Sequence, residues 1–124
     1  FKQVIRIDSN YLQAHYNLGG VYAGLGKYRD AIEAFQQVIR IDPDYALVRN
    51  NLGIAYGALG RYKEAAEAFQ QAIRIDPDDA DAHLSLGIAY LSLNDRGSAL
   101  EQYKILKSLD PKLAKRLFSV IKRN

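Results

Sequence analysis

A repeat of 34 residues constrains the fold of this chain more than any other feature of its sequence. The run Phe-Gln-Gln-Val-Ile-Arg-Ile-Asp-Pro-Asp at residues 35–44 returns at residues 69–78 with one change. Repeats of this length are typical of chains in which one supersecondary unit stacks on copies of itself and buries a continuous core. Three units follow one another, at residues 12–45, 46–79 and 80–113.

Hydrophobic periodicity predicts two helices in each unit. In the second unit, Val48, Leu52 and Tyr56 follow at steps of four, which is one face of an amphipathic helix. Gly60 interrupts this pattern, and Pro77 ends the next one because proline has no N–H to donate. The chain is therefore expected to be all-α, a stack of antiparallel helix hairpins. Helices are predicted at residues 1–7, 11–24, 28–41, 45–58, 62–75, 79–92, 96–109 and 112–123.

The N-terminal end does not form a whole unit. Residues 1–8 align with residues 35–42, so residues 1–11 are expected to be the second helix of a truncated unit. The chain also contains no Met, and we interpret it as a fragment or processed product. Without a partner helix, this half repeat is expected to leave an apolar edge that favours self-association, at Val4, Ile5 and Ile7.

The C-terminal end is expected to be a capping helix over residues 114–124. Repeat arrays need an end helix with one apolar stripe and a polar outer face. Basic residues are dense here, with only Asp110 against them. We favour a solvated face of the cap, although the run could also attract an acidic peptide or nucleic acid. The run comprises Lys104, Lys107, Lys112, Lys115, Arg116, Lys122 and Arg123.

Small residues indicate where the two helices of a hairpin meet. Gly53 and Ala65 lie on opposite helices of the second unit, where small side chains would permit close approach. Tyr56 and Phe69 are large enough to fill the remaining space. The same arrangement is expected from the pairs Gly19/Ala31 and Gly87/Ala99.

The same motif positions recur in every unit. They hold His15, Leu18, Gly19, Tyr22, Gly26, Tyr28, Ala31, Phe35, Val38 and Pro43, then Arg49, Leu52, Gly53, Tyr56, Gly60, Tyr62, Ala65, Phe69, Ala72 and Pro77, and finally His83, Leu86, Gly87, Tyr90, Asn94, Arg96, Ala99, Tyr103, Leu106 and Pro111. This pattern resembles the tetratricopeptide repeat (TPR) family, whose motif runs Trp, Leu-Gly, Tyr, Gly, Tyr, Ala, aromatic, Ala, Pro. The resemblance covers nearly the whole chain.

The resemblance implies a right-handed superhelix, or α-solenoid, whose concave face is lined by the first helix of each unit. The Trp of the family motif is replaced in all three units, by His15, Arg49 and His83. In the third unit, Asn94 replaces the hairpin glycine, which is tolerable because Asn also adopts left-handed turn geometry. Arg96 replaces an aromatic residue in the same unit and is expected to loosen that turn.

No constellation in the sequence points to catalysis. The chain has no Cys, which excludes disulfides, thiolate metal sites and a cysteine nucleophile. His15 and His83 lie two units apart, and because packed helices are about 8–10 Å apart they cannot share a metal. Both are interpreted as partly buried packing residues. We expect no catalytic residue, no cofactor and no metal, and therefore no enzyme within this chain.

Composition limits the classes of partner and the cellular location that we expect for this chain. The chain has 17 basic and 14 acidic residues, a formal net charge of +3, which by itself names no nucleic-acid partner. No apolar run approaches the ~18 residues of a membrane span, and the first residues do not form a signal peptide. A cytoplasmic protein with a protein or peptide partner, and no membrane partner, is expected.

The resemblance implies that the partner lies along the concave face. Asn17 and Asn51 occupy the same position in successive units and resemble an asparagine ladder that binds peptide backbones, since a carboxamide both donates and accepts. The alternative, that they are solvated or stabilise neighbouring units, stays open. Exposed apolar residues on this face would mark a partner site. The predicted site residues are Gln13, Tyr16, Asn17, Gly20, Leu47, Asn50, Asn51, Ile54, Asp81, Leu84, Ser85 and Ile88.

The predicted function is a non-enzymatic scaffold for protein–protein interaction. TPR domains that clamp the C-terminal carboxylate of a chaperone use Lys, Asn and Arg at set positions of this face. Only Asn51 fits that set, so the sequence argues against the carboxylate clamp. The alternative function is a substrate-recruiting fragment of a larger enzyme, such as a glycosyltransferase. The clamp positions hold Tyr16, Gly20, Asn51, Asp81 and Ser85.

Overall fold

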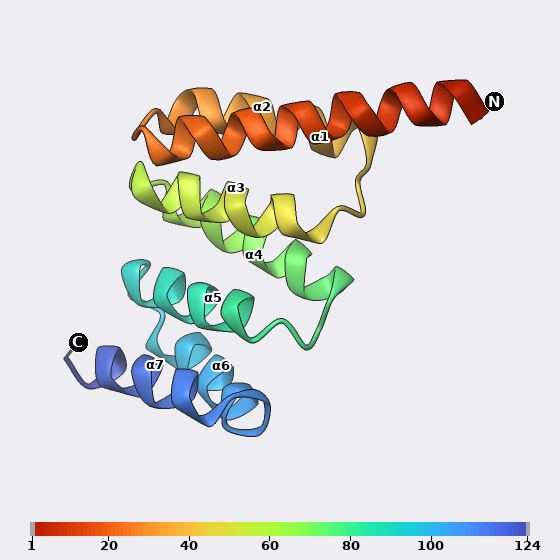
Figure 1. The fold of residues 1–124 in the computed structure, drawn as a ribbon. Helices are drawn as coiled ribbons and strands as arrows, with labels where there is room; N and C mark the ends of the chain where they lie inside the picture. Colours follow the sequence, from red (N-terminus) through yellow and green to blue (C-terminus); the bar gives the residue numbers. More distant parts are fainter. Residues whose placement is uncertain (1, 124) are drawn as a thin grey trace.

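Seven helices stack into three hairpins and a closing helix (Figure 1). The computed structural model describes the backbone of residues 2–123 and the side chains of residues 10–123, and within this part it contains no strand. The fold is therefore an α-solenoid of antiparallel helix hairpins, as predicted. The helices are α1 (Lys2–Gly24), α2 (Tyr28–Ile41), α3 (Ala46–Ala58), α4 (Tyr62–Ile75), α5 (Ala80–Ser92), α6 (Arg96–Leu109) and α7 (Pro111–Arg123).

The second helix of each hairpin has the predicted bounds, but the N-terminal region differs from the prediction. Residues 1–7 and 11–24 were expected to form separate helices, whereas α1 is continuous over Lys2–Gly24. Ser9 stands where the next unit has Pro43, so every backbone N–H is present and nothing forces a break. The prediction of two separate helices in this region is therefore wrong, while the assignment of residues 1–11 to a truncated unit stays a prediction. The apolar edge at Val4, Ile5 and Ile7 lies outside the described side chains and stays a prediction.

Each hairpin turns through one residue with a positive φ. The φ angles are 78° at Gly26, 77° at Gly60 and 63° at Asn94. The N–H of Lys27 then donates to the carbonyl of Tyr22 at 2.8 Å, which is the long-range bond of a Schellman turn, and the other two hairpins repeat it. Asn94 is thus tolerated in the left-handed position, as the sequence predicted.

Glycines on α1, α3 and α5 permit close packing, but the third unit differs. A β-carbon added at Gly53 would lie 2.6 Å from Cε1 of Phe69, and Gly19 meets Phe35 in the same way. At Gly87 the nearest atoms belong instead to Leu117 of α7, at 2.7 Å. The closing helix therefore supplies to the third unit the contact that an aromatic ring supplies to the first two.

The closing helix begins at Pro111, one residue before the predicted start at residue 112. Proline is favoured in the first turn, and the Asp110 carboxylate accepts from the backbone N–H of Lys112 at 3.1 Å, which caps the helix. Arg96 was expected to loosen the preceding turn. Its Nη1 instead donates to the carbonyl of Ile121 at 2.8 Å, so it ties the third hairpin to the end of α7.

Candidate functional site

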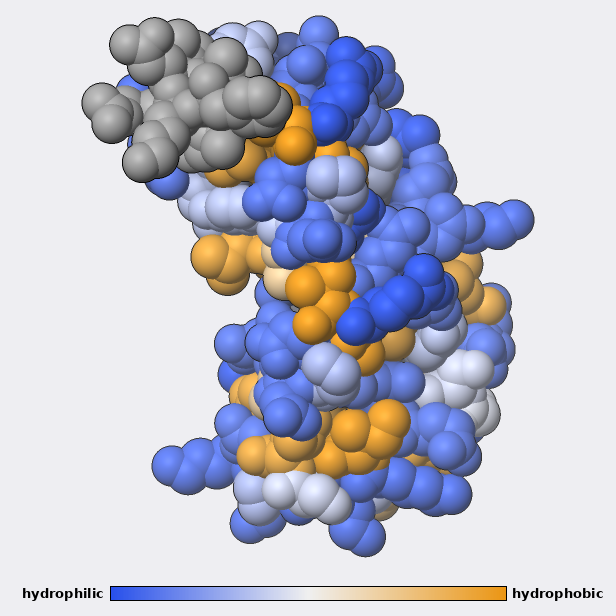
Figure 2. Space-filling model, turned by 90° about the vertical axis from the view of Figure 1, so that its right-hand side faces the viewer, coloured by the Kyte–Doolittle hydropathy of each residue, from blue (hydrophilic) through white to orange (hydrophobic). Residues whose placement is uncertain are grey.

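The first helices of the hairpins line one face of the molecule. α1, α3, α5 and α7 lie side by side in front, with α2, α4 and α6 behind them (Figure 1). In the side view of Figure 2, the outline is indented on the left, the side that these front helices form, and hydrophobic side chains are exposed along it. We call this the concave face.

Most of the predicted site residues are exposed on the front helices. Four are half-buried: Tyr16, Asn50, Asn51 and Ser85. Asn50 is notable because its Oδ1 is enclosed and has no hydrogen-bond partner among the residues that the structure describes. The exposed members are Gln13, Asn17, Gly20, Leu47, Ile54, Asp81 and Ile88.

Leu84 is a correction to the predicted site. It is only 9% exposed and belongs to a core cluster with Leu117 and Ile121 of α7. Leu84 was predicted to lie on the concave face and contact the partner. The closing helix instead packs directly beside α5 and buries that side chain.

The two asparagines of the proposed ladder have different surroundings. Nδ2 of Asn51 donates to the Tyr16 hydroxyl at 3.0 Å, which links the first and second units. Tyr16 also packs against Tyr45, with ring centroids 5.5 Å apart. Oδ1 of exposed Asn17 instead accepts from Gln13 one turn away, at 3.0 Å. Asn51 therefore contributes to the junction between units, whereas Asn17 faces outward.

An apolar notch of about 200 Å³ opens between the second and third units. Gly53, Gly57 and Ala65 are among its small lining residues, and a β-carbon at Gly57 would meet no atom within 4 Å. Tyr62 was not among the predicted site residues, because the motif assigns it to the hairpin turn. The other lining residues are Ile54, Phe69, Ser85, Ile88, Ala89 and Ser92.

A basic pocket of about 260 Å³ adjoins this notch and shares Ile88 with it. Among the residues that the structure describes, its charged lining residues are Arg116 and Arg123 of α7 alone. Sequence reasoning noticed the basic run that contains them but interpreted it as a solvated face. What the sequence did not reveal is that these arginines lie beside Ile88. Leu84, Ser119 and Val120 complete the lining.

A third cavity, of about 420 Å³, lies on the N-terminal hairpin and not on the concave face. Tyr11, Leu18 and Asp30 are among its lining residues. Leu18 is 42% exposed, whereas Leu52 at the same repeat position is only 7% exposed. The difference arises because α2 packs against α3, whereas the described residues place no hairpin before α1.

Two of the three residues at the family's Trp position, Arg49 and His83, hold the loops between units. Nε of Arg49 donates to the carbonyl of Pro43 at 3.1 Å. His83 is buried, and its Nε2 lies 2.8 Å from the carbonyl of Pro77. His15 is half-buried and packs edge-on against Tyr11. His15 is thus half-buried, as predicted, whereas His83 is more deeply buried than predicted.

No metal site or membrane span is found in the described part of the chain. No group of three His, Cys, Asp or Glu side chains there is arranged to hold a metal ion. None of the described helices combines the length and the apolar character needed to cross a membrane.

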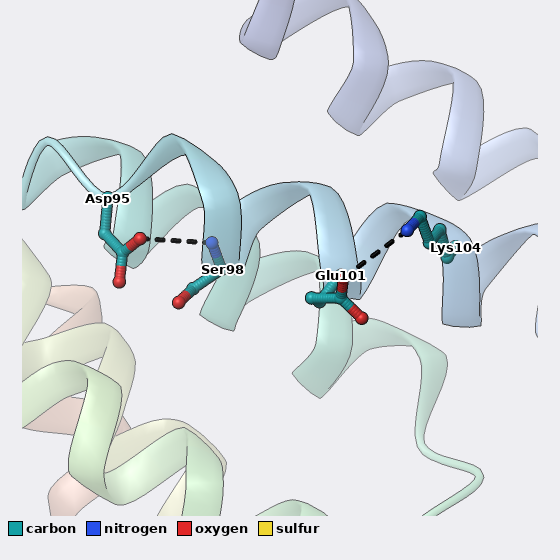
Figure 3. Close-up of polar contacts among 4 residues, drawn as sticks. All are labelled: Asp95, Ser98, Glu101 and Lys104. Carbon is teal, nitrogen blue, oxygen red and sulfur yellow. Dashed lines mark hydrogen bonds and ion pairs between the residues drawn. The ribbon is translucent and has the colours of Figure 1, made fainter.

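The polar contacts of α6 stabilise the helix (Figure 3). The Asp95 carboxylate accepts from the backbone N–H of Ser98 at 3.1 Å, which caps α6. Hydrogen bonds from the Ser98 hydroxyl and then from its N–H hold the pKa of Asp95 below its ordinary value. Glu101 and Lys104 form an exposed ion pair at 3.4 Å, which contributes little to stability.

Comparisons with known proteins point to one family. A family model described as TPR repeat matches residues 21–60 and 58–94. No curated protein sequence matches the chain significantly.

Several solved structures share the fold. One is the second TPR domain of the human RPAP3 protein in complex with the HSP70 peptide SGPTIEEVD, which is 28% identical, with a TM-score of 0.87 over 94% of this chain and 99% of that one. The Sgt2 TPR domain from Aspergillus fumigatus is 26% identical, with a TM-score of 0.82 over 90% of this chain and 77% of that one. MamA is 26% identical, with a TM-score of 0.80 over 98% of this chain and 82% of that one.

Proposed function

Because the chain belongs to the TPR repeat family, we propose that it is a non-enzymatic scaffold that binds a peptide segment of a partner protein along its concave face. The observation that carries this proposal is a stripe of exposed aliphatic residues on that face. Leu47, Ile54 and Ile88 are 59%, 52% and 41% exposed. Contiguous apolar surface of this kind marks partner sites.

The comparisons support a peptide as the partner. The second TPR domain of RPAP3, at 28% identity, is in complex with a peptide of HSP70. A shared fold supports peptide binding by this chain only if the side chains of its concave face suit a peptide. Here the face offers aliphatic side chains and outward-facing amides, Gln13 and Asn17, which suit a peptide with both apolar side chains and polar backbone groups.

The proposed mode is not the chaperone carboxylate clamp. That clamp needs cations on the first helices of the units, whereas the positions concerned hold Tyr16, Gly20, Asn51, Asp81 and Ser85. Asp81 would repel a terminal carboxylate. Nδ2 of Asn51, the single residue of suitable type, already donates to Tyr16.

A peptide selection tests the proposal. Residues 1–124 would be panned against a displayed library of random 12-residue peptides, and the selected peptides synthesised for fluorescence-polarisation titration. Ile54→Asp is expected to reduce affinity at least tenfold, because it places a charge in the apolar stripe. Ile105→Asp is the matched control, since Ile105 is an exposed isoleucine on α6, at 41%. Equal affinities for both variants would contradict the assignment of the face.

Self-association is a second candidate, favoured by the apolar surface of the N-terminal hairpin. Leu18, Val21 and Leu25 are all more than 40% exposed there. We propose that a second copy of the chain covers this surface. Sedimentation velocity is expected to show a concentration-dependent dimer that Val21→Asp abolishes; a monomer at all concentrations would reject the proposal.

A further inference from the structure

We propose that the C-terminal half of the concave face selects peptides with an aliphatic side chain next to a side-chain carboxylate. The aliphatic group would enter the apolar notch between α3 and α5, and the carboxylate would pair with Arg116 and Arg123 of α7. This inference rests on the proposed function and names the partner chemistry of the same face.

The notch fits one aliphatic side chain. The notch has a volume of about 200 Å³, and its walls include Ile54, Tyr62 and Ile88. Beside Gly57 the space is empty, because an added β-carbon would meet no atom within 4 Å. Ser92 at the edge donates its hydroxyl to the carbonyl of Ile88 within its own helix, at 3.2 Å. Because that hydroxyl is already satisfied, the notch presents mainly carbon to an incoming group, and burial of an aliphatic side chain there is favourable.

The adjoining pocket is cationic, and no acidic side chain is among its described lining residues. α7 contains five basic residues and no acidic one. The ion pairs within the described residues are Arg61–Glu64 and Lys104–Glu101, so neither arginine of the pocket takes part in one. Nε of Arg123 donates to the carbonyl of Ser119 at 3.4 Å, which leaves its terminal nitrogens available. A guanidinium presents two parallel donors that match a carboxylate.

The two sites act on one ligand because they share a wall. Ile88 lines both the notch and the basic pocket. A peptide that places an apolar side chain against Ile54 and Ile88 would therefore carry its neighbouring residues to Arg116. A nucleic acid would satisfy the arginines but has no aliphatic group for the notch, so the pairing of the two sites favours a peptide.

The arginines that would bind the carboxylate lie at a different place from the residues of the carboxylate clamp. Here the cations lie on the closing helix, and Asp81 of α5 does not line the pocket. A side-chain carboxylate within a peptide is therefore the expected ligand, in place of a chain terminus.

A display library whose peptides have blocked C-termini tests the inference, because it offers only side-chain carboxylates. Residues 1–124 are expected to enrich peptides with Leu, Ile or Val within a few positions of Asp or Glu. Enrichment of aliphatic peptides without an acid preference would overturn the inference and leave the proposed function intact. Absence of any enrichment would overturn both.

A charge reversal provides the second readout. Selection with Arg116→Glu/Arg123→Glu is expected to replace the acidic preference by Lys or Arg while the aliphatic preference remains. Lys112→Glu/Lys115→Glu changes the charge of α7 equally, but neither lysine lines the pocket, so its selected peptides should stay acidic. If both variants lost the preference for acidic peptides, the net charge of α7 would explain that preference, and the proposed contact of the carboxylate with Arg116 and Arg123 would be overturned.

A filling substitution tests the notch. Gly57→Leu can enter the open space without a clash at its β-carbon, and it is expected to lower the affinity of a selected peptide at least tenfold. Gly97→Leu on α6 is the control, because its nearest contact, Asp95 Oδ1, is 3.9 Å away and it lies outside the notch. Unchanged affinity for Gly57→Leu would show that the aliphatic group binds elsewhere. A double-stranded DNA probe that bound as tightly as the peptide would also contradict the inference.

Discussion

A β-carbon at Gly53 would lie 2.6 Å from Cε1 of Phe69, too close for two non-bonded carbon atoms unless one of them moves. Phe69 is buried in a core cluster with Ala65 and Leu86, so its ring cannot shift without disturbing that packing. Gly53→Ala is therefore expected to destabilise the chain by roughly 1–3 kcal/mol, the usual cost of overpacking a core. Urea unfolding followed by circular dichroism measures the loss.

The control for that substitution is Gly57→Ala, one turn further along α3. Nothing lies within 4 Å of an added β-carbon there. Because alanine is the better helix former, Gly57→Ala should stabilise the chain by roughly 0.5–1 kcal/mol. If both substitutions shifted stability in the same direction, the packing described for Gly53 would be incorrect.

Ala65 and Ala58 differ in the same way on α4 and α3. Ala65 is buried against the hairpin core, whereas Ala58 is exposed. Ala65→Leu is expected to cost roughly 1–3 kcal/mol, and Ala58→Leu much less. Thermal or urea unfolding of both variants would decide, and equal costs would mean that the faces of these helices are assigned wrongly.

The hydrogen bond between Asn51 and Tyr16 should couple the first two units. A double-mutant cycle with Asn51→Ala and Tyr16→Phe is expected to give an interaction energy of about 0.5–1.5 kcal/mol, typical of one hydrogen bond. Strictly additive effects on the free energy of unfolding would show that the two side chains do not interact in solution.

Asp95 should make stability depend on pH. Hydrogen bonds from Ser98 hold its folded-state pKa below the ordinary value, so its contribution is complete above about pH 4 and is lost as pH falls below that. Asp95→Ala is expected to be less stable than the parent at neutral pH, with a difference that shrinks in acid. Unfolding midpoints across the acid range measure this, and a difference independent of pH would exclude the carboxylate as the cause.

Much of the fold could be predicted from the repeat. The bounds of α2, α4 and α6 followed from periodicity and from the Asp-Pro pairs, because these signals are local. The repeat predicted a break in α1 that does not exist. Residues 1–8 align with the end of a repeat unit, but Ser9 stands in place of the proline that would end the helix. The left-handed Asn94 was also predictable from its place in the repeat.

The candidate site was less predictable because it depends on contacts between distant segments. Position within a unit predicted that Ile54 and Ile88 face outward from the first helices of their units, and both side chains are exposed. It could not show that α7 covers Leu84 or that Arg116 lies beside Ile88, because the closing helix has no counterpart in the repeat. Both outcomes are set by the packing of α7 on α5, which periodicity alone does not reveal.

The most direct test of the central claim is an amide chemical-shift titration of 15N-labelled residues 1–124 with a selected peptide. We predict that saturable shifts concentrate on the concave helices, around Ile54, Ile88 and Arg116, and on the residues of α4 that line the notch, while α2 and the outer side of α6 remain unchanged. Shifts confined to the N-terminal hairpin or to the rear helices would contradict the claim that the concave face binds the partner.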